Sequence, residues 1–243
     1  MEKPIIEVRN LKKAFEEKEI LRGVDLNLFR GENIGVLGKS GTGKSGLTKC
    51  IVRLIEPDAG EITVFGEDMI NLNDKQLNDI RKKVGYLFQG GALYDSMSVR
   101  ENLEFPIRRT QMSADKQEVE NLIEQALRSV GLLDAIEKMP AELSGGMKKR
   151  IGLARALILK PEIILYDEPT TGLDPVTSGE ISELILKVQE EYNASSIIIT
   201  HDMKCAKITT NKIKILSEGF FVAEGTYDEL SHSKDKEIRD YFL

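Results

Sequence analysis

Residues 38–45 have the composition and spacing of a phosphate-binding loop. They read GKSGTGKS, which fits the pattern GxxxxGK[ST], and they directly follow an apolar run that ends at Leu37. Glycines let the backbone curl so that successive N–H groups point at one phosphate, and the helix that follows adds the positive end of its dipole. We predict that Lys44 reaches the β- and γ-phosphates of a nucleotide and that Ser45 binds Mg²⁺. The predicted nucleotide contacts are Gly38, Lys39, Ser40, Gly41, Thr42, Gly43, Lys44, Ser45 and Gly46.

Two neighbouring carboxylates, Asp167 and Glu168, follow the apolar run Ile163–Tyr166. A phosphate-binding loop needs a carboxylate on the metal side, so Asp167 is the predicted Mg²⁺-side residue. Glu168 faces the other side of the strand end, where it is predicted to orient or deprotonate the water that attacks the γ-phosphate. Each motif also has an alternative without a ligand. Two carboxylates at a strand end can be solvated turn residues, and residues 38–45 can be a glycine-rich turn between a strand and a helix. The presence of both motifs in one chain favours the catalytic interpretation.

Ser144, Gly145 and Gly146 form a second pattern suited to an anion. Ser144 is a good N-cap, and the two glycines leave backbone N–H groups open at the start of a predicted helix. The alternative is a capped helix start with no ligand. The phosphate-binding loop of the same chain needs no second anion site, so the pattern raises the question of which anion it would bind.

Together these motifs resemble those of the ATPases of ABC transporters. Leu143–Met147 resembles the LSGGQ signature of that family and precedes the strand of Asp167 at the usual distance, and the resemblance covers essentially the whole chain. It implies an α/β P-loop NTPase fold with a RecA-like core, an antiparallel β subdomain and an inserted helical lobe. It also implies ATP and Mg²⁺ as cofactors and a head-to-tail homodimer, in which each signature motif holds the γ-phosphate bound by the partner. We expect one ABC ATPase domain over residues 1–243, with the helical lobe at about 90–158.

The resemblance assigns roles to further positions. Phe15 resembles the aromatic residue that stacks on adenine, Gln89 the glutamine near Mg²⁺, and His201 the switch histidine at the γ-phosphate. Gly172–Pro175 resembles the loop at the dimer seam. Taken singly, Phe15 could be a core residue, Gln89 a surface residue and His201 a structural histidine. The predicted catalytic residues are Glu168, His201, Gln89 and Lys44, and the predicted metal-side residues are Ser45, Gln89 and Asp167.

Two positions depart from the family pattern. Met147 replaces the signature glutamine and removes hydrogen-bonding capacity, and Gly46 stands where many members have threonine. Neither change removes a group with an assigned catalytic role. We therefore expect ATP hydrolysis to survive both.

The basic residues after Met147 and the segments 91–99 and 102–106 resemble the ATPases of Mla/Mce-linked phospholipid transport systems. In that family the segment after Gln89 faces the coupling helix of a membrane subunit. Leu93, Tyr94 and Met97 are therefore candidate contacts, although such apolar residues could also fill the core of the lobe. The implied partners are membrane permease subunits and an Mce-type lipid-binding protein. The alternatives are another cargo, such as amino acids, and a non-transport ABC nucleotide switch.

The apolar periodicity predicts the elements that must position these residues. Alternation of apolar and polar residues is typical of half-exposed antiparallel strands, and it occurs in Ile6–Arg9, Val24–Leu28 and Gly60–Val64. Short continuous apolar runs predict parallel strands of a central sheet at Ile34–Leu37, Ile163–Tyr166 and Ser196–Ile199. Helical spacing predicts a helix over Gln117–Val130 that is capped by Gly131, and a second one from near Ser144 to about Leu159.

Composition limits the classes of partner. The 243 residues include 34 basic and 40 acidic side chains, so the formal charge of -6 argues against a surface built to neutralise nucleic-acid phosphates. No apolar run approaches the roughly 18–20 residues that span a bilayer, and the first residues lack the apolar region of a secretory signal. With the family resemblance, this places the chain as a peripheral protein on the cytoplasmic face of the inner (cell) membrane. Cys50 and Cys205 lack metal-ligand spacing and are predicted to be reduced packing residues.

Overall fold

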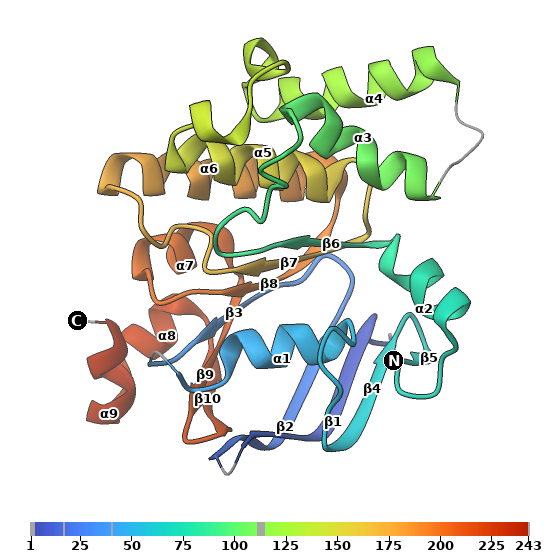
Figure 1. The fold of residues 1–243 in the computed structure, drawn as a ribbon. Helices are drawn as coiled ribbons and strands as arrows, with labels where there is room; N and C mark the ends of the chain where they lie inside the picture. Colours follow the sequence, from blue (N-terminus) through green and yellow to red (C-terminus); the bar gives the residue numbers. More distant parts are fainter. Residues whose placement is uncertain (1–2, 17, 40, 111–114, 243) are drawn as a thin grey trace. The chain divides into compact units, whose positions relative to one another are not determined.

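Strands and helices alternate along the chain in a computed structural model, which describes residues 3–16, 18–39, 41–110 and 115–242. The chain folds into two compact units. One consists of Met1–Arg81 and Ser195–Leu243, and the other of Lys82–Ala194. The ribbon in Figure 1 follows both along the sequence.

The first unit combines an antiparallel sheet with a set of mainly parallel strands. Its elements are β1 (Ile6–Phe15), β2 (Lys18–Leu28), β3 (Asn33–Leu37), α1 (Lys44–Ile51), β4 (Ala59–Val64), β5 (Glu67–Asp68), α2 (Asp74–Arg81), β8 (Ser195–Ile199), α7 (Met203–Thr209), β9 (Lys212–Ser217), β10 (Phe220–Gly225), α8 (Tyr227–Ser231), α9 (Lys236–Arg239) and the 3-10 turn η3 (Asp240–Phe242).

The antiparallel sheet has the strand order β2-β1-β4-β5. Ile6 of β1 pairs with Leu28 of β2 on one side and with Val64 of β4 on the other, and all three side chains are buried. Burial alternates along Val24–Leu28 of β2, because successive side chains of a strand point to opposite faces of the sheet. Along β1 the alternation is interrupted where its register with β2 shifts. The strands predicted from alternation are therefore confirmed.

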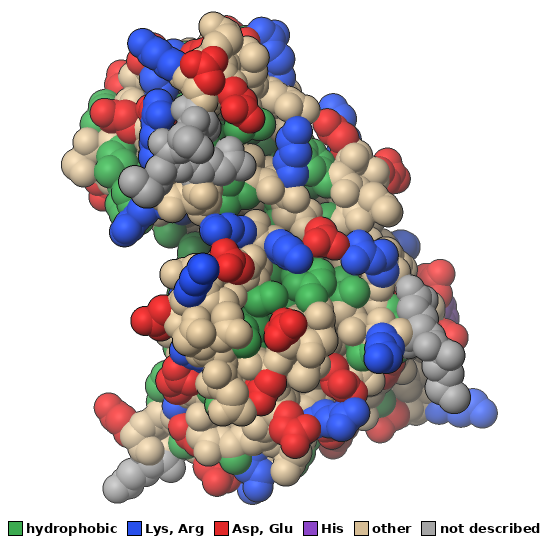
Figure 2. Space-filling view, turned by 90° about the vertical axis from the view of Figure 1, so that its right-hand side faces the viewer, with side chains coloured by type: hydrophobic (Ala, Val, Ile, Leu, Met, Phe, Trp, Pro, Cys, Tyr) green, Lys and Arg blue, Asp and Glu red, His purple; other side chains and the backbone are tan. Residues whose placement is uncertain are grey.

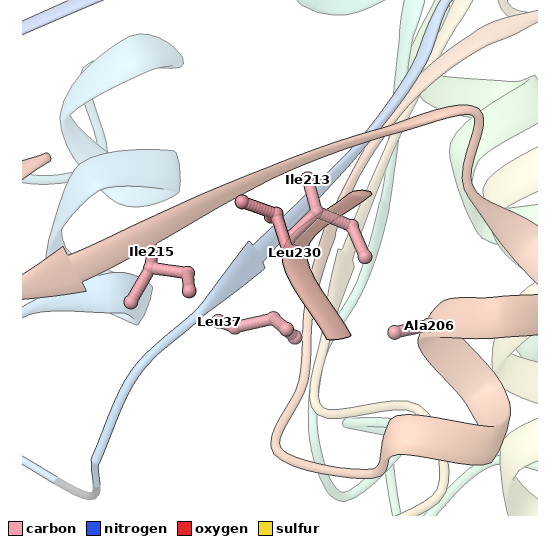
Figure 3. Close-up of a cluster of buried hydrophobic side chains, with 5 residues drawn as sticks. All are labelled: Leu37, Ala206, Ile213, Ile215 and Leu230. Atoms are coloured by element: carbon pink, nitrogen blue, oxygen red, sulfur yellow. The ribbon is translucent and has the colours of Figure 1, made fainter. Parts of the chain in front are cut away.

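The strand that leads into the phosphate-binding loop is β3, which pairs in parallel with β8 and with β9. Every residue of β8 is buried, as a continuous apolar run predicts for a strand covered on both faces. Behind the end of β3, Leu37 packs with Ala206, Ile213, Ile215 and Leu230 (Figure 3). This core fixes the point at which the loop leaves the strand.

The second unit is mainly helical. Its elements are β6 (Val84–Leu87), α3 (Val99–Thr110), α4 (Lys116–Ser129), the 3-10 turns η1 (Leu133–Ala135) and η2 (Pro140–Glu142), α5 (Gly145–Leu157), β7 (Ile163–Asp167) and α6 (Pro175–Tyr192). Strands β6 and β7 pair in parallel, and the helices lie together on one side of them in Figure 1.

Local signals end α4 and begin α5 where the sequence predicts. Gly131 has φ 70°, its N–H donates to the Arg128 carbonyl, and the Leu132 N–H donates to the Leu127 carbonyl. This is the Schellman arrangement that a glycine after a helix makes possible. At the start of α5 the Ser144 hydroxyl accepts a hydrogen bond from the Met147 N–H at 3.2 Å. Both predicted helices are confirmed, with α5 ending two residues earlier than expected.

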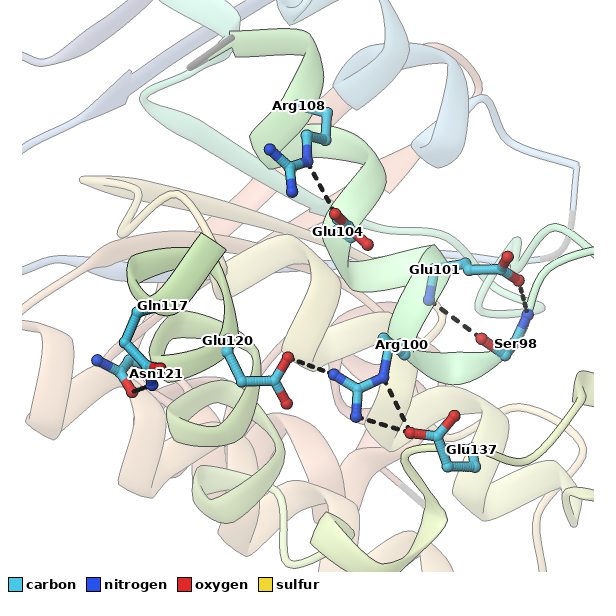
Figure 4. Close-up of polar contacts among 9 residues, drawn as sticks. All are labelled: Ser98, Arg100, Glu101, Glu104, Arg108, Gln117, Glu120, Asn121 and Glu137. Atoms are coloured by element: carbon cyan, nitrogen blue, oxygen red, sulfur yellow. Dashed lines mark hydrogen bonds and ion pairs between the residues drawn. The ribbon is translucent and has the colours of Figure 1, made fainter. Parts of the chain in front are cut away.

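Charged side chains join α3 to neighbouring segments of this unit. Arg100 bonds Glu120 of α4 and also Glu137, and these contacts raise its pKa above the ordinary value (Figure 4). At the start of α3 the Ser98 N–H donates to the Glu101 carboxylate, and the Glu101 N–H donates to the Ser98 hydroxyl. This reciprocal pair is a capping box, which fixes where α3 begins and hence where the preceding loop ends.

The surface carries both signs of charge. Figure 2 shows acidic and basic side chains intermixed over the face it displays, with hydrophobic side chains in small groups between them. Over the described ranges, no helix has both the length and the apolar character that crossing a bilayer requires. Cys50 and Cys205 are both buried and form no disulfide, and burial raises the pKa of Cys50 to about 11.

Candidate functional site

The phosphate-binding loop lies between β3 and α1 and curls around its own lysine. The Lys44 ammonium belongs to a residue only 6% exposed and donates to the carbonyls of Gly38 at 2.7 Å and Lys39 at 3.0 Å. The Thr42 hydroxyl also donates to the Lys39 carbonyl, at 2.9 Å. Ser40, one of the predicted contacts, lies outside the described residues. The lysine is thus held at the centre of the loop, where a phosphate would meet it.

Two glycines of this loop stand where a side chain does not fit. A Cβ atom at Gly38 would lie 2.4 Å from the Leu216 carbonyl oxygen. Gly43, the N-cap of α1, has φ 97°, and a Cβ atom there would lie 2.8 Å from the Ile20 carbonyl oxygen. The loop therefore packs closely on both neighbouring strands, which glycine alone permits.

The structure also gives a reason for glycine in place of threonine at position 46. A Cβ atom on Gly46 would meet the Ile20 Cδ1 atom at 3.0 Å and the Phe15 ring at 4.0 Å. The Phe15 side chain is 46% exposed, so its ring is open to solvent beside the start of α1. Phe15 is thus free to stack on a flat ligand, as its predicted role requires.

The structure brings His201 to the phosphate-binding loop. His201 is exposed after β8 and shares a pocket of about 660 Å³ with Gly38 and Lys39. The opposite wall comes from the C-terminal segment, where Asp235 and Tyr241 are among the lining residues. The sequence analysis did not predict that the C-terminal segment lines this pocket. The apolar residues Ile238, Tyr241 and Phe242 could have indicated it, because they pack against the core cluster of Figure 3.

Asp167 and Glu168 end β7 in the second unit. Asp167 is 4% exposed, whereas Glu168 is half-buried and has the left-handed φ of 52°. One oxygen of the Glu168 carboxylate accepts a hydrogen bond from the Thr171 hydroxyl at 2.8 Å. Non-glycine residues adopt this backbone conformation rarely, and such residues concentrate at functional sites. The hydrogen bond from Thr171 thus holds the Glu168 carboxylate at the turn that follows β7.

The signature segment occupies the N-terminal end of α5. Ser144 and Gly145 are exposed, and Gly146 is buried against α6, where a Cβ atom would lie 2.7 Å from the Thr177 methyl group. The helix start thus presents the exposed residues Ser144 and Gly145 to solvent, and a helix N-terminus of this kind suits an anion. Gln89 is exposed two residues after β6.

Each unit contributes a predicted oxygen ligand for Mg²⁺. Ser45 lies in the first unit and Asp167 in the second, and each side chain carries a hard oxygen of the kind that Mg²⁺ prefers. In the part of the chain that the structure describes, no three His, Cys, Asp or Glu side chains gather into a metal site of their own. Mg²⁺ in nucleotide sites usually takes one or two protein ligands together with phosphates and waters.

A buried asparagine organises the loop after Gln89. Asn102 is fully buried, and its amide donates to the carbonyls of Tyr94, Met97 and Ser98 at 3.2, 2.9 and 3.0 Å. Its oxygen accepts the Tyr94 N–H at 2.8 Å. Arg155 of α5 adds a bond to the Gly91 carbonyl at 3.0 Å. Tyr94 remains 46% exposed, so the loop presents an aromatic side chain on a rigid base.

We expect Asn102→Ala to lower the free energy of unfolding by about 3 kcal/mol, because it removes a fully buried side chain and leaves the Tyr94 N–H and several carbonyls without their bonds. Urea denaturation followed by circular dichroism measures the loss. The control is Asn121→Ala on the exposed face of α4, with an expected change within about 0.5 kcal/mol. Equal losses in the two variants would contradict the role of Asn102 as the organiser of this loop.

Comparisons with known proteins agree with this geometry. Residues 21–171 match the family described as ABC transporter. The intermembrane phospholipid transport system ATP-binding protein MlaF of Haemophilus influenzae is 38% identical, over 98% of this chain and 90% of that protein. The probable ribonucleotide transport ATP-binding protein mkl of Mycobacterium leprae is 39% identical, over 97% of this chain and 68% of that protein.

Among solved structures, the ATP-binding cassette MJ0796, a dimer in a post-hydrolysis state bound to ADP and Pi, superposes with a TM-score of 0.83. It is 31% identical, and the match covers 91% of this chain and 98% of that one. The prediction of an α/β P-loop fold of the ABC type is thereby confirmed. The chain belongs to the ABC transporter family, as an ATP-binding subunit with ATPase activity.

Proposed function

We propose that this ATPase drives the transport of phospholipid through separate membrane subunits. The observation that carries the proposal is the match to MlaF, which extends over nearly the full length of both chains. The mkl match covers less of its relative, which is named as a probable ribonucleotide transport protein. The segments around residues 91–106 and Met147 add support, since they resemble the phospholipid systems. Transport of another cargo, such as amino acids, remains the alternative.

In the proposed reaction, the loop N–H groups and Lys44 bind the phosphates of ATP, and Phe15 stacks on adenine. Glu168 accepts a proton from the attacking water as the water oxygen bonds to the γ-phosphorus. The bond from that phosphorus to the bridging oxygen breaks, and its electron pair leaves with ADP. His201 donates a hydrogen bond to the γ-phosphate. Ser45, Asp167 and Gln89 would hold Mg²⁺, which would neutralise phosphate charge.

The proposed active state is a head-to-tail homodimer. Ser144, Gly145 and Gly146 would hold the γ-phosphate of the partner's ATP, which supplies the anion that this exposed helix start suits. Val176, beside the Gly172–Pro175 loop, is 71% exposed, and an apolar side chain there suits a protein contact. The solved relative MJ0796 is a dimer.

The proposed membrane partners are permease subunits that contact the loop after Gln89, with an Mce-type lipid-binding protein in the same system. Tyr94 is a large exposed hydrophobic residue of this loop, and Asn102 holds its backbone in place. The chain would thereby be a peripheral protein on the cytoplasmic face of the inner membrane. The intermixed surface charge in Figure 2 gives no support to a nucleic-acid partner.

Purification of the tagged chain from its native membranes tests the proposal. We expect a permease and phospholipid to co-purify, as identified by mass spectrometry, and the complex to hydrolyse ATP faster than the isolated chain. Tyr94→Ala should reduce permease recovery severalfold, whereas Phe220→Ala, at another exposed aromatic residue, should not. A permease with a different bound solute would overturn the lipid cargo. Recovery of ribosomes without any membrane protein would overturn the transport role.

A further inference from the structure

The signature helix carries a buried lysine. Lys149 of α5 is 5% exposed, and its ammonium donates to the main-chain carbonyl of Glu168 at 3.1 Å. A buried ammonium is costly unless hydrogen bonds replace its lost water. The contact therefore joins α5, whose N-terminus is the signature segment, to the residue proposed to activate water.

The carbonyl that Lys149 contacts belongs to an unusual backbone turn. Glu168 has φ 52°, and the same carbonyl also accepts the Thr171 N–H at 3.3 Å. The carboxylate of Glu168 is held separately by the Thr171 hydroxyl at 2.8 Å. Because this backbone conformation is rare for a residue with a side chain, surrounding bonds must hold it. Lys149 supplies the one charged donor among the three bonds described here.

We propose that Lys149 is a positioning residue for Glu168. Its bond to the carbonyl holds the Glu168 peptide in the left-handed turn, and the turn sets the direction of the carboxylate toward the attacking water. This inference rests on the catalytic role of Glu168 proposed above. It also assigns a second task to the signature helix, since the helix that presents Ser144 orients a carboxylate of its own chain through Lys149.

Three variants distinguish a positioning role of Lys149 from a general effect on the stability of the fold. Lys149→Met keeps the length and apolar packing of the side chain but removes the donor, and Lys149→Arg keeps a charged donor. Lys148→Met is the matched control, because Lys148 is the neighbouring half-buried lysine of the same helix. We expect Lys149→Met to lower kcat on the order of tenfold while the Kd for ATP changes less than about twofold. Lys149→Arg should recover most of kcat, and Lys148→Met should stay within about twofold of the parent protein.

Glu168→Gln provides the decisive background. If Lys149 acts through the carboxylate, Lys149→Met should cause no further loss in single-turnover hydrolysis once Glu168 is glutamine, because the two effects are not independent. A further loss of about tenfold in that background would overturn the positioning role, as would an unchanged kcat in Lys149→Met alone. An unchanged turnover in Glu168→Gln alone would instead overturn the proposed catalytic role of Glu168, so the two failures can be told apart.

Discussion

Glu168→Gln is expected to lower the rate of ATP hydrolysis by at least about 100-fold, because an amide cannot accept the proton of the attacking water. The amide has nearly the same shape as the carboxylate, and its oxygen can still accept the bond from the Thr171 hydroxyl. ATP binding depends on the phosphate-binding loop and should persist. The rate is measured by phosphate release, and binding by retention of labelled ATP. With hydrolysis blocked, ATP-bound dimers should accumulate and elute earlier in size-exclusion chromatography.

The control for this experiment is Glu183→Gln, which makes the same chemical change at an exposed position of α6. Its turnover should match that of the parent protein. If Glu168→Gln hydrolyses ATP at the parent rate, Glu168 is not the group that activates water. Loss of ATP binding in the same variant would also contradict the proposed division of roles.

Lys44→Ala is expected to weaken ATP binding by about 100-fold or more. Hydrogen bonds to charged groups contribute about 1.5–3 kcal/mol each, and about 1.4 kcal/mol changes a dissociation constant tenfold. The variant loses the ammonium that would meet the phosphates. It also loses the bonds to the Gly38 and Lys39 carbonyls that hold the loop in its curled form. Isothermal titration calorimetry with ATP measures the change directly.

Lys49→Ala is the control, because it removes a half-buried lysine at the other end of α1 and so tests for a general effect of charge. Its dissociation constant should stay within about threefold of the parent value. An equal loss of affinity in both variants would show that ATP binding depends on the overall positive charge and not on Lys44 itself. Retention of full affinity in Lys44→Ala would remove the phosphate role of this lysine.

The sequence predicts the local elements of the site well, because their signals lie close together in the chain. Continuous apolar runs predict β3 and β7, and the glycine after α4 predicts its Schellman cap. The serine cap of α5 follows from the same kind of short-range rule. Each of these features depends on residues within about six positions of one another.

Features made by distant parts of the chain could not be predicted in this way. Lys149 reads as one of several basic residues after the signature, and only the folded chain places its ammonium on the carbonyl of Glu168. The left-handed backbone conformation at Glu168 could not be predicted, because the residue there is not a glycine. The C-terminal wall of the pocket at His201 depends on packing against the core behind β3. The roles of the individual site residues remain predictions that the variants above test.

The two buried cysteines make this chain suitable for site-directed labelling. Only a thiolate reacts quickly with maleimide reagents. Burial raises the pKa of Cys50 to about 11, and Cys205 is as fully buried as Cys50. A cysteine introduced at an exposed position such as Val176 would therefore react selectively in the otherwise natural sequence. Paired spin labels or fluorophores at that position could report the distance between two copies as nucleotide is added. The native thiols need not be removed first, which keeps the packing of α1 and α7 intact.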